Sequence, residues 1–310
     1  MFMLAGLMGM MAVGAIAYVE ITKSDDPDED ETPEAPADDE SAGNQPRINL
    51  LTGTDLDDKL VGDAIDGLSG ADELRGGTGA DLLQGKDGND TLHGEDGNDH
   101  LTGGEGDDDL AGHNGDDWLS GGTGDDRLQG SAGNDMVSGE EGRDVLQGGL
   151  DDDTLIGGLG EDTLFGGWGA DVLSGVVPSQ DNLANDNDEG DYLNGGGGDD
   201  TIIAGQSDTV TAGAGADDIL LGSWITPGAA AQIVDFAPDE DSLIFVWDDS
   251  TDTASEPDIR LAPDPANAGQ LQMWMGNHVV AQIAGDTPLE DANIAMIPLS
   301  AMDGLGLWRP

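Results

Sequence analysis

The nonapeptide GGTGADLLQ, Gly76–Gln84, is one copy of a unit that repeats without a gap from Gly67 to about residue 175. Aspartate occupies the sixth position of twelve successive units, from Asp72 to Asp171, and glycine occupies the first position of all twelve. The fourth position is glycine in every unit but one, which carries Asp151, and the eighth position is always leucine or valine. Such a period is the signature of a repeat architecture in which each unit adopts the same local structure.

Each unit combines a tight turn with a short strand. Glycine supplies the backbone conformations with positive φ that a tight turn needs, and the last three positions place one aliphatic side chain between two variable ones, as in a three-residue strand. One unit cannot bury its aliphatic side chain alone, but two units can form a coil of eighteen residues with strands on two opposed parallel sheets. We therefore predict an all-β fold, a parallel β-roll or β-helix-like solenoid over residues 51–222.

The aspartate column decides what stabilises such a roll. Stacking places each turn aspartate beside the one eighteen residues away, as with Asp81, Asp99 and Asp117, and two carboxylates about 5 Å apart repel by roughly 3 kcal/mol at an effective dielectric near 20. Aspartate also suits turns for local reasons, but that preference does not explain one residue type at one phase. A calcium ion reverses the repulsion, because it takes six to eight oxygen ligands from carboxylates and carbonyls in flexible geometry.

The unit resembles the RTX, or hemolysin-type, nonapeptide GGxGxDxUx, strongly over residues 67–175 and loosely over 53–221. The resemblance implies a calcium-binding parallel β-roll that forms after export, with Ca²⁺ between turns and at most ten full sites in the regular array. Asp151 and the non-glycine residues at several second positions depart from the pattern. Weaker units follow around Asp191 and Asp208. The expected side-chain ligands, including those of two late units, are Asp72, Asp81, Asp90, Asp99, Asp108, Asp117, Asp126, Asp135, Asp144, Asp153, Asp162, Asp171, Asp200 and Asp217.

Composition excludes several functions. The chain has 310 residues and a formal net charge of −57, so its surface repels nucleic acids and anionic lipid headgroups. It has no cysteine, which excludes disulfides and thiolate metal sites. Its four histidines form no HExxH motif, no GxSxG motif occurs, and three of the histidines occupy variable repeat positions. We therefore expect solvated surface histidines and no enzyme.

The N-terminal region has a different character. Residues 2–19 are uncharged and mostly apolar, and as an apolar helix they would span about 27 Å. Residues 1–21 are thus a membrane anchor or a cleaved signal segment, with a non-membrane apolar segment as the third alternative, and they offer a membrane tether. Ten of the sixteen residues in 25–40 are acidic, which predicts an acidic disordered linker over 22–50.

Residues 223–310 lose the glycine pattern and carry short apolar runs at 233–236, 243–247, 271–275 and 278–283, which predict a small C-terminal β segment. Six apolar residues gather at outward or turn positions late in the array. They allow two interpretations, packing by the C-terminal segment or an adhesive patch for a protein or cell-surface partner. The six are Leu150, Ile156, Leu159, Phe165, Trp168 and Val172.

The leading functional hypothesis is an exported, calcium-dependent β-roll protein that folds on binding Ca²⁺, located outside the cell or at its surface. The alternative is a calcium-rigidified cell-surface structural or adhesion protein. A third hypothesis, an exported enzyme, would require an active site within residues 223–310.

Overall fold

The computed structural model describes residues 50–54, 56, 59–62, 64–176, 190–249, 256–284 and 294–302. The chain divides into two units, Met1–Pro46 and Arg47–Pro310, and only the second contains described residues. The apolar helix expected within residues 1–21 and nearly all of the linker expected at 22–50 lie outside the described residues. Within the described ranges, no helix is long and apolar enough to cross a membrane.

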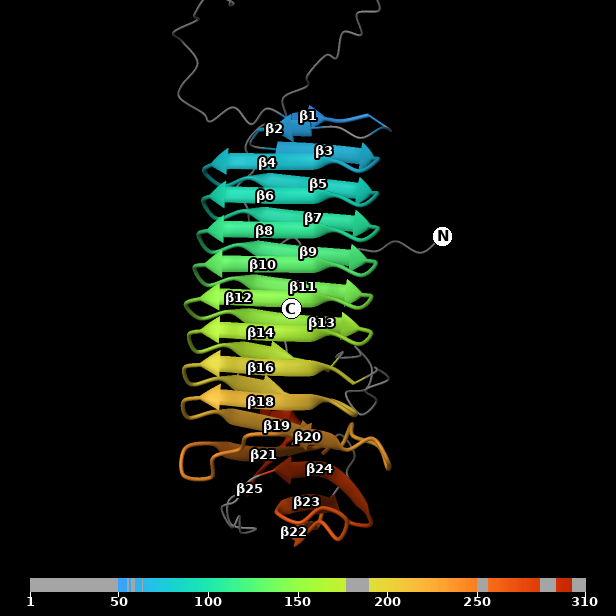
Figure 1. The fold of residues 1–310 in the computed structure, drawn as a ribbon, viewed down its shortest axis with the longest axis vertical. Helices are drawn as coiled ribbons and strands as arrows, with labels where there is room; N and C mark the ends of the chain where they lie inside the picture. The colour runs from blue at the N-terminus through green and yellow to red at the C-terminus, as the bar shows by residue number, and fades with distance from the viewer. Residues whose placement is uncertain are drawn as a thin grey trace, which may run out of the picture. The chain divides into compact units, whose positions relative to one another are not determined.

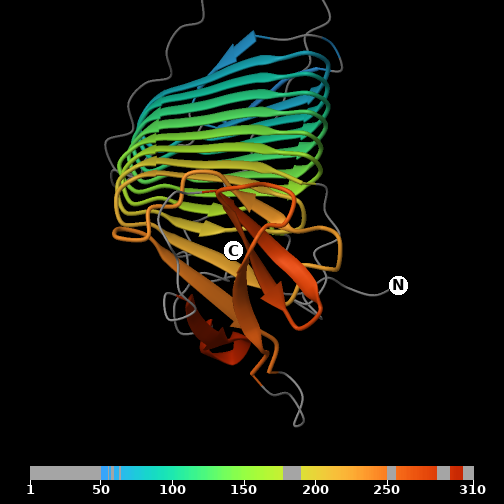
Figure 2. The same cartoon turned by 60° about the horizontal axis from the view of Figure 1, so that its bottom comes forward.

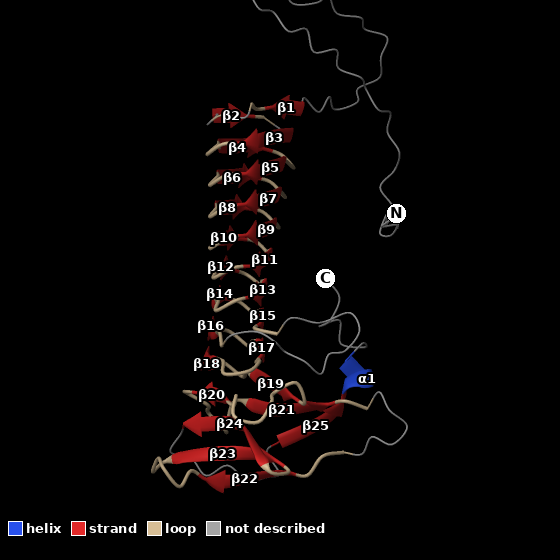
Figure 3. Cartoon of the chain, turned by 90° about the vertical axis from the view of Figure 1, so that its right-hand side faces the viewer, coloured by secondary structure: helices blue, strands red, loops and turns tan. Residues whose placement is uncertain are grey.

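Two stacked sheets form the predicted parallel solenoid, with successive strands alternating between them (Figure 1). The edge-on view in Figure 3 separates the two sheets into two columns of strands. The first sheet contains, in spatial order, β1 (Leu50–Thr52), β3 (Ala64–Ser69), β5 (Leu82–Asp87), β7 (His100–Glu105), β9 (Trp118–Thr123), β11 (Met136–Glu141), β13 (Thr154–Leu159), β15 (Val172–Ser174), β17 (Thr201–Ile203), β19 (Asp218–Gly222), β21 (Ser242–Trp247) and β25 (Ile294–Pro298). The second sheet contains β2 (Lys59–Val61), β4 (Glu73–Thr78), β6 (Thr91–Asp96), β8 (Asp109–Asn114), β10 (Arg127–Ala132), β12 (Val145–Leu150), β14 (Thr163–Trp168), β16 (Tyr192–Gly197), β18 (Thr209–Ala214), β20 (Ala231–Ile233), β24 (His278–Ala284), β23 (Gln270–Met275) and β22 (Ile259–Pro263).

The register confirms the coil of eighteen residues, since Leu83 pairs with Leu101 and Leu101 pairs with Leu119. The strands are longer than the expected three residues: most span six and run into the glycines of the next unit. The reason is that the turn backbones also stack in parallel register, as in the pairing of Lys86 with Gly104. Backbone hydrogen bonding therefore continues around much of each coil.

A single layer of aliphatic side chains fills the space between the sheets. The eighth-position leucines and Val137 are at most 1 % exposed, and the alternation of buried and exposed residues along each strand is the one expected for a sheet with one covered face. Because each unit contributes one large side chain, this core is thin. The strong interior packing of an ordinary domain is absent from the regular coils of the described array.

The array resumes in register after residues 177–189. Thr163 of β14 pairs with Tyr192 of β16, an offset of 29 residues, and Tyr192 pairs with Thr209, an offset of 17. The late units around Asp191 and Asp208 are therefore genuine coils of the same solenoid. Both sheets continue across this gap in the described residues, since β14 pairs with β16 and β15 pairs with β17.

The predicted C-terminal strands are present and extend the solenoid. β20 stacks on β18 and β21 stacks on β19, both in parallel, so each sheet continues past residue 222. β24, β23 and β22 then add antiparallel pairs, and a short helix, α1 (Leu299–Met302), follows β25. Figure 2 brings these last strands toward the viewer. Large aromatic side chains, Trp224 and Phe245 among them, are buried here, which gives this end a thicker core than the repeats have.

Candidate metal centre in the stacked turns

The turns stack along the two edges of the solenoid (Figure 1). The sixth-position aspartates in these turns form two hydrogen-bonded ladders, one along each edge. Oδ1 of Asp99 accepts a hydrogen bond from the backbone N–H of Asp81 at 2.8 Å, and Oδ1 of Asp117 accepts one from the N–H of Asp99 at 2.8 Å. The same contact, at 2.7 to 2.9 Å, links every successive pair. One ladder runs through Asp72, Asp90, Asp108, Asp126, Asp144, Asp162, Asp191 and Asp208, and the other through Asp81, Asp99, Asp117, Asp135, Asp153, Asp171, Asp200 and Asp217.

In most of these aspartates the second carboxylate oxygen, Oδ2, is buried without a hydrogen-bond partner. In the described part of the chain, Oδ2 is buried without a hydrogen-bond partner in twelve of them, although the side chains are at most 3 % exposed. An unsatisfied buried carboxylate oxygen is costly, and a repeated one indicates a missing ion. The twelve are Asp90, Asp99, Asp108, Asp117, Asp126, Asp135, Asp144, Asp153, Asp162, Asp171, Asp200 and Asp217.

The first-position glycines leave space beside these oxygens. A methyl group added at Gly85 would lie 2.2 Å from Oδ2 of Asp90 and 2.9 Å from the carbonyl oxygen of Gly103. At Gly103 the corresponding distances are 2.2 Å to Oδ2 of Asp108 and 2.7 Å to the carbonyl oxygen of Gly121. At these glycines, the carboxylate oxygen of the same turn and a carbonyl oxygen of the next coil therefore meet in one small space that only glycine leaves open.

These oxygens fit calcium. Carboxylate and carbonyl oxygens are the ligands that Ca²⁺ prefers, and its flexible coordination suits a site assembled from two stacked turns. No group of three or more Asp, Glu, His or Cys side chains that could hold a metal ion occurs among the described residues. A turn site therefore depends on main-chain carbonyls for most of its ligands, with the aspartates supplying the negative charge.

The departures from the repeat consensus are accommodated by backbone conformation. Second-position residues other than glycine, such as Lys86 and Glu95, adopt positive φ of 88° and 81°. Asp151, the exception at the fourth position, has φ of 73°, and the ladder contacts of Asp153 beside it remain intact at 2.8 and 2.9 Å. Although the sequence left this turn in doubt, Asp151 does not interrupt the ladder of aspartates.

Burial raises the pKa of the ladder carboxyls in the absence of a cation. Desolvation is the largest cause throughout, partly offset by the hydrogen bond from the backbone N–H of the preceding aspartate. The pKa of Asp117 rises to about 7 and that of Asp153 to about 8. Protonation is the way in which such a carboxyl avoids a buried charge when no cation is bound.

Three ladder residues were not among the expected ligands. Asp191 and Asp208 continue the first ladder, and the aliphatic residue two positions after each of them was the available signal. Asp241 ends the second ladder, since its Oδ1 accepts the N–H of Asp217 at 3.3 Å. At this end of the first ladder, Oδ2 of Asp208 has a main-chain donor, the N–H of Gly205 at 2.6 Å.

The exposed fifth-position side chains form further hydrogen-bonded contacts between coils. Here the side chain accepts from the N–H of the following coil, whereas in the sixth-position ladders it accepts from the preceding coil. Oδ1 of Asn98 accepts the N–H of Asp116 at 3.2 Å, and Oδ1 of Asp116 accepts the N–H of Asn134 at 3.0 Å. These side chains are exposed, unlike the adjacent sixth-position aspartates. They tie successive turns together through neutral or solvated groups.

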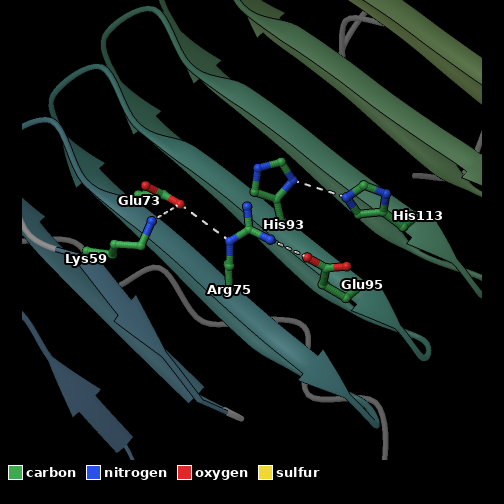
Figure 4. A network of polar contacts seen from close by, with 6 residues as sticks. All are labelled: Lys59, Glu73, Arg75, His93, Glu95 and His113. Atoms are coloured by element: carbon green, nitrogen blue, oxygen red, sulfur yellow. Dashed lines mark hydrogen bonds and ion pairs between the residues drawn. The ribbon is translucent and has the colours of Figure 1, made fainter.

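The three repeat histidines are half-buried instead of fully solvated, and one of them, His113, occupies a second turn position with φ of 79°. Nδ1 of His93 lies 3.1 Å from Nε2 of His113, beside an ion pair between Arg75 and Glu95 at 2.6 Å (Figure 4). Burial, followed by the nearby Arg75 charge, lowers the pKa of His93. His100 packs edge-on against Trp118, with ring centroids 4.9 Å apart.

A family model of known repeat proteins agrees with this geometry. A family model described as the RTX calcium-binding nonapeptide repeat (4 copies) matches residues 52–83, 66–101, 75–110, 84–119, 111–146, 138–173 and 195–223. No curated protein matches the chain. Among solved structures, the crystal structure of the extracellular lipase LipA from Serratia marcescens matches with a TM-score of 0.23 and 14 % identity, over 83 % of this chain and 41 % of the lipase chain. The chain thus spans less than half the length of that structure.

The glycine space gives a first prediction. Gly85→Ala places a methyl group where the oxygens of Asp90 and Gly103 converge, so we expect loss of calcium binding at that turn and a shift of the calcium midpoint to higher concentration. Gly77→Asn is the matched control, because it leaves that space alone and other units carry side chains at this position with positive φ. Isothermal titration calorimetry measures both, and equal effects of the two substitutions would contradict the model of the site.

The raised pKa values give a second prediction. A folded-state pKa of about 7, above the unfolded value of about 3.9, means that protonation stabilises the cation-free roll. This contribution is complete below pH of about 4 and is lost as the pH rises through 6 to 8. In chelator, far-ultraviolet circular dichroism should therefore show more β-structure at pH 5 than at pH 8. An unchanged spectrum between pH 5 and pH 8 would refute the raised pKa values of the ladder carboxyls.

Proposed function

Since residues 52–173 and 195–223 of this chain carry RTX calcium-binding nonapeptide repeats in a β-solenoid, we propose that it is an exported protein that binds Ca²⁺ in its stacked turns and folds on binding. The buried, unpartnered Oδ2 atoms that line each edge carry the proposal. Successive carboxylates within one column are separated by about one strand spacing and repel strongly, and a thin core offers little to offset that repulsion.

Coupling of folding to calcium follows from the same balance. Ion binding is possible only when two turns are stacked, so its free energy is added to the folded state and not to the unfolded chain. Extracellular fluids hold far more free calcium than the cytosol, so such a chain would remain unfolded before export and fold afterwards. Export to the extracellular space or cell surface, and a membrane tether through residues 2–19, are parts of this proposal.

The proposed role is binding and not catalysis. The aspartates are committed to ladders in which Oδ1 accepts a backbone N–H, and their repetition along two edges suits many equivalent ions better than one reactive centre. Ca²⁺, when bound, supplies charge neutralisation and cross-links successive turns. The residues themselves position the oxygens and exclude water from them.

A pair of adjacent residues tests the role of the ladder. Asp117→Asn removes the charge of a buried sixth-position carboxylate, whereas Asp116→Asn makes the same change at the exposed neighbour. We expect the calcium concentration at half-folding, followed by circular dichroism, to rise several-fold for Asp117→Asn and to stay within error for Asp116→Asn. If calcium induces no β-structure in the unsubstituted chain, coupled folding is excluded.

A second candidate function, a calcium-rigidified surface or adhesion protein, is favoured by the late apolar residues. The structure divides these over both outer faces, and on the second sheet Leu150 pairs with Trp168 while Phe165 lies 5.8 Å from Tyr192, centroid to centroid. Trp168 is 72 % exposed and Leu150 52 %, so packing by the C-terminal segment is wrong for these two. We name Leu150, Phe165, Trp168 and Tyr192 the Trp168 patch.

Charged substitutions distinguish this candidate. Phe165→Asp with Trp168→Asp should abolish attachment to cells or surfaces while the calcium midpoint stays unchanged, because neither side chain lies in a turn site or in the core. The matched control is Gln147→Asp, which places a charge on the same face in the strand beside Phe165. Retained attachment of the double variant would rule the Trp168 patch out as an adhesive surface.

A further inference from the structure

A cavity of about 560 Å³ lies against the outer face of the second sheet near its C-terminal end, far along the chain from the regular repeats. The tip of the β23–β24 hairpin, strand β20 and the loops around Ser207 and Gly228 line it. Gln232 and Gln282 sit side by side in the pairing of β20 with β24. The volume falls within the roughly 300–1,000 Å³ typical of small-molecule sites.

Two buried nitrogen atoms in the lining lack partners. Apart from Asp66 and the ladder carboxylates, the buried side-chain polar atoms that have no hydrogen-bond partner within the described residues are Nε1 of Trp274 and Nε2 of His278. Both residues line this cavity. Buried polar atoms without partners also support the proposed calcium sites. They point to a ligand because a native fold rarely leaves such atoms unsatisfied.

The hairpin is shaped around these two residues. The register between β23 and β24 shifts at Met273 and Trp274, and such irregularities re-aim side chains. The guanidinium of Arg260 lies 4.7 Å from the centroid of the Trp274 ring, which holds the indole on one side. Trp274 and His278 are only half-buried as whole side chains, so part of each ring is exposed where it lines the cavity.

The remaining lining defines the chemistry of an occupant. Ser207, Gln232, Asn277 and Gln282 are neutral groups that both donate and accept hydrogen bonds, and none of the described residues that line the cavity carries a carboxylate or guanidinium. In a chain of net charge −57, a site without acidic groups does not suit a cation, and the surrounding field opposes an anion. A ligand rich in hydroxyl groups satisfies the indole N–H as acceptor and the imidazole nitrogen in either tautomer.

We propose that this cavity, lined by Ser207, Gln232, Trp274, Asn277, His278 and Gln282, is a binding site for a neutral saccharide of one or two sugar units. Hydroxyl groups pair with the amides and with the two ring nitrogens, and the apolar face of a sugar ring packs on the exposed part of the indole. The site is separate from the turn sites and adds a ligand of another class to the proposed calcium function.

Ligand-observed saturation-transfer NMR tests the proposal on the full chain at saturating calcium, with maltose, cellobiose, lactose and N,N′-diacetylchitobiose as probes. We expect at least one probe to bind with a millimolar dissociation constant. Asn277→Ala and Gln282→Ala should each weaken it by about five-fold, the loss of one or two hydrogen bonds. Trp274→Phe, which keeps a ring and removes the N–H, should also weaken it.

Trp168→Ala is the matched control, because Trp168 is an exposed tryptophan on the same sheet but outside the cavity. It should leave saccharide binding unchanged, and circular dichroism in calcium should show that all variants fold. The proposal is overturned if none of the four probes binds up to 20-fold above about 1 mM, or if Trp168→Ala weakens binding as much as the cavity variants do. Neither result bears on calcium binding, which the dichroism reports separately.

Discussion

The structure depends on how a buried carboxylate column is neutralised. Each ladder aspartate uses Oδ1 to accept the N–H of the preceding coil, which fixes the position of the carboxylate, and leaves Oδ2 in a space that glycine keeps open. Hydrogen bonding alone therefore orders the column of carboxylates but does not neutralise its negative charge. Either protons or divalent cations must supply the missing charge, and the two have opposite dependence on pH. Above neutral pH, only the cation remains available.

The thin leucine layer and the ladders stabilise the coils in different ways. The leucines bury one large side chain per unit, which sets the distance between the sheets, while the turn contacts set the distance and register between coils. The exposed fifth-position side chains add solvated contacts at the same edges. Towards the C-terminal end, Trp224 and Phe245 thicken the core and carboxylates such as that of Asp208 find main-chain donors. That end therefore relies less on ions than the regular coils do.

Much of this could be predicted from the sequence because the period carries the information. The spacing of Asp81, Asp99 and Asp117 predicted an eighteen-residue coil, and the invariant first glycine marked the turn. The length of the strands could not be predicted, since turn residues such as Lys86 join the sheets only through pairing between coils. The place of Asp241 in the second ladder was also hidden, because an irregular offset of 24 residues separates it from Asp217. The cavity beside Trp274 comes from segments distant in sequence and left no local pattern.

The stacking of each strand on its neighbours in the same sheet has a consequence for cooperativity. Each coil contacts only the coil before it and the coil after it, so the array behaves as a one-dimensional chain of coupled units. In such a chain a defect at either end shortens the ordered segment by a coil, whereas a defect at the middle, near β11 and β12, divides it into two shorter segments that must each remain stable alone. The position of a lesion along the axis, and not only its chemistry, therefore determines how much of the molecule it unravels.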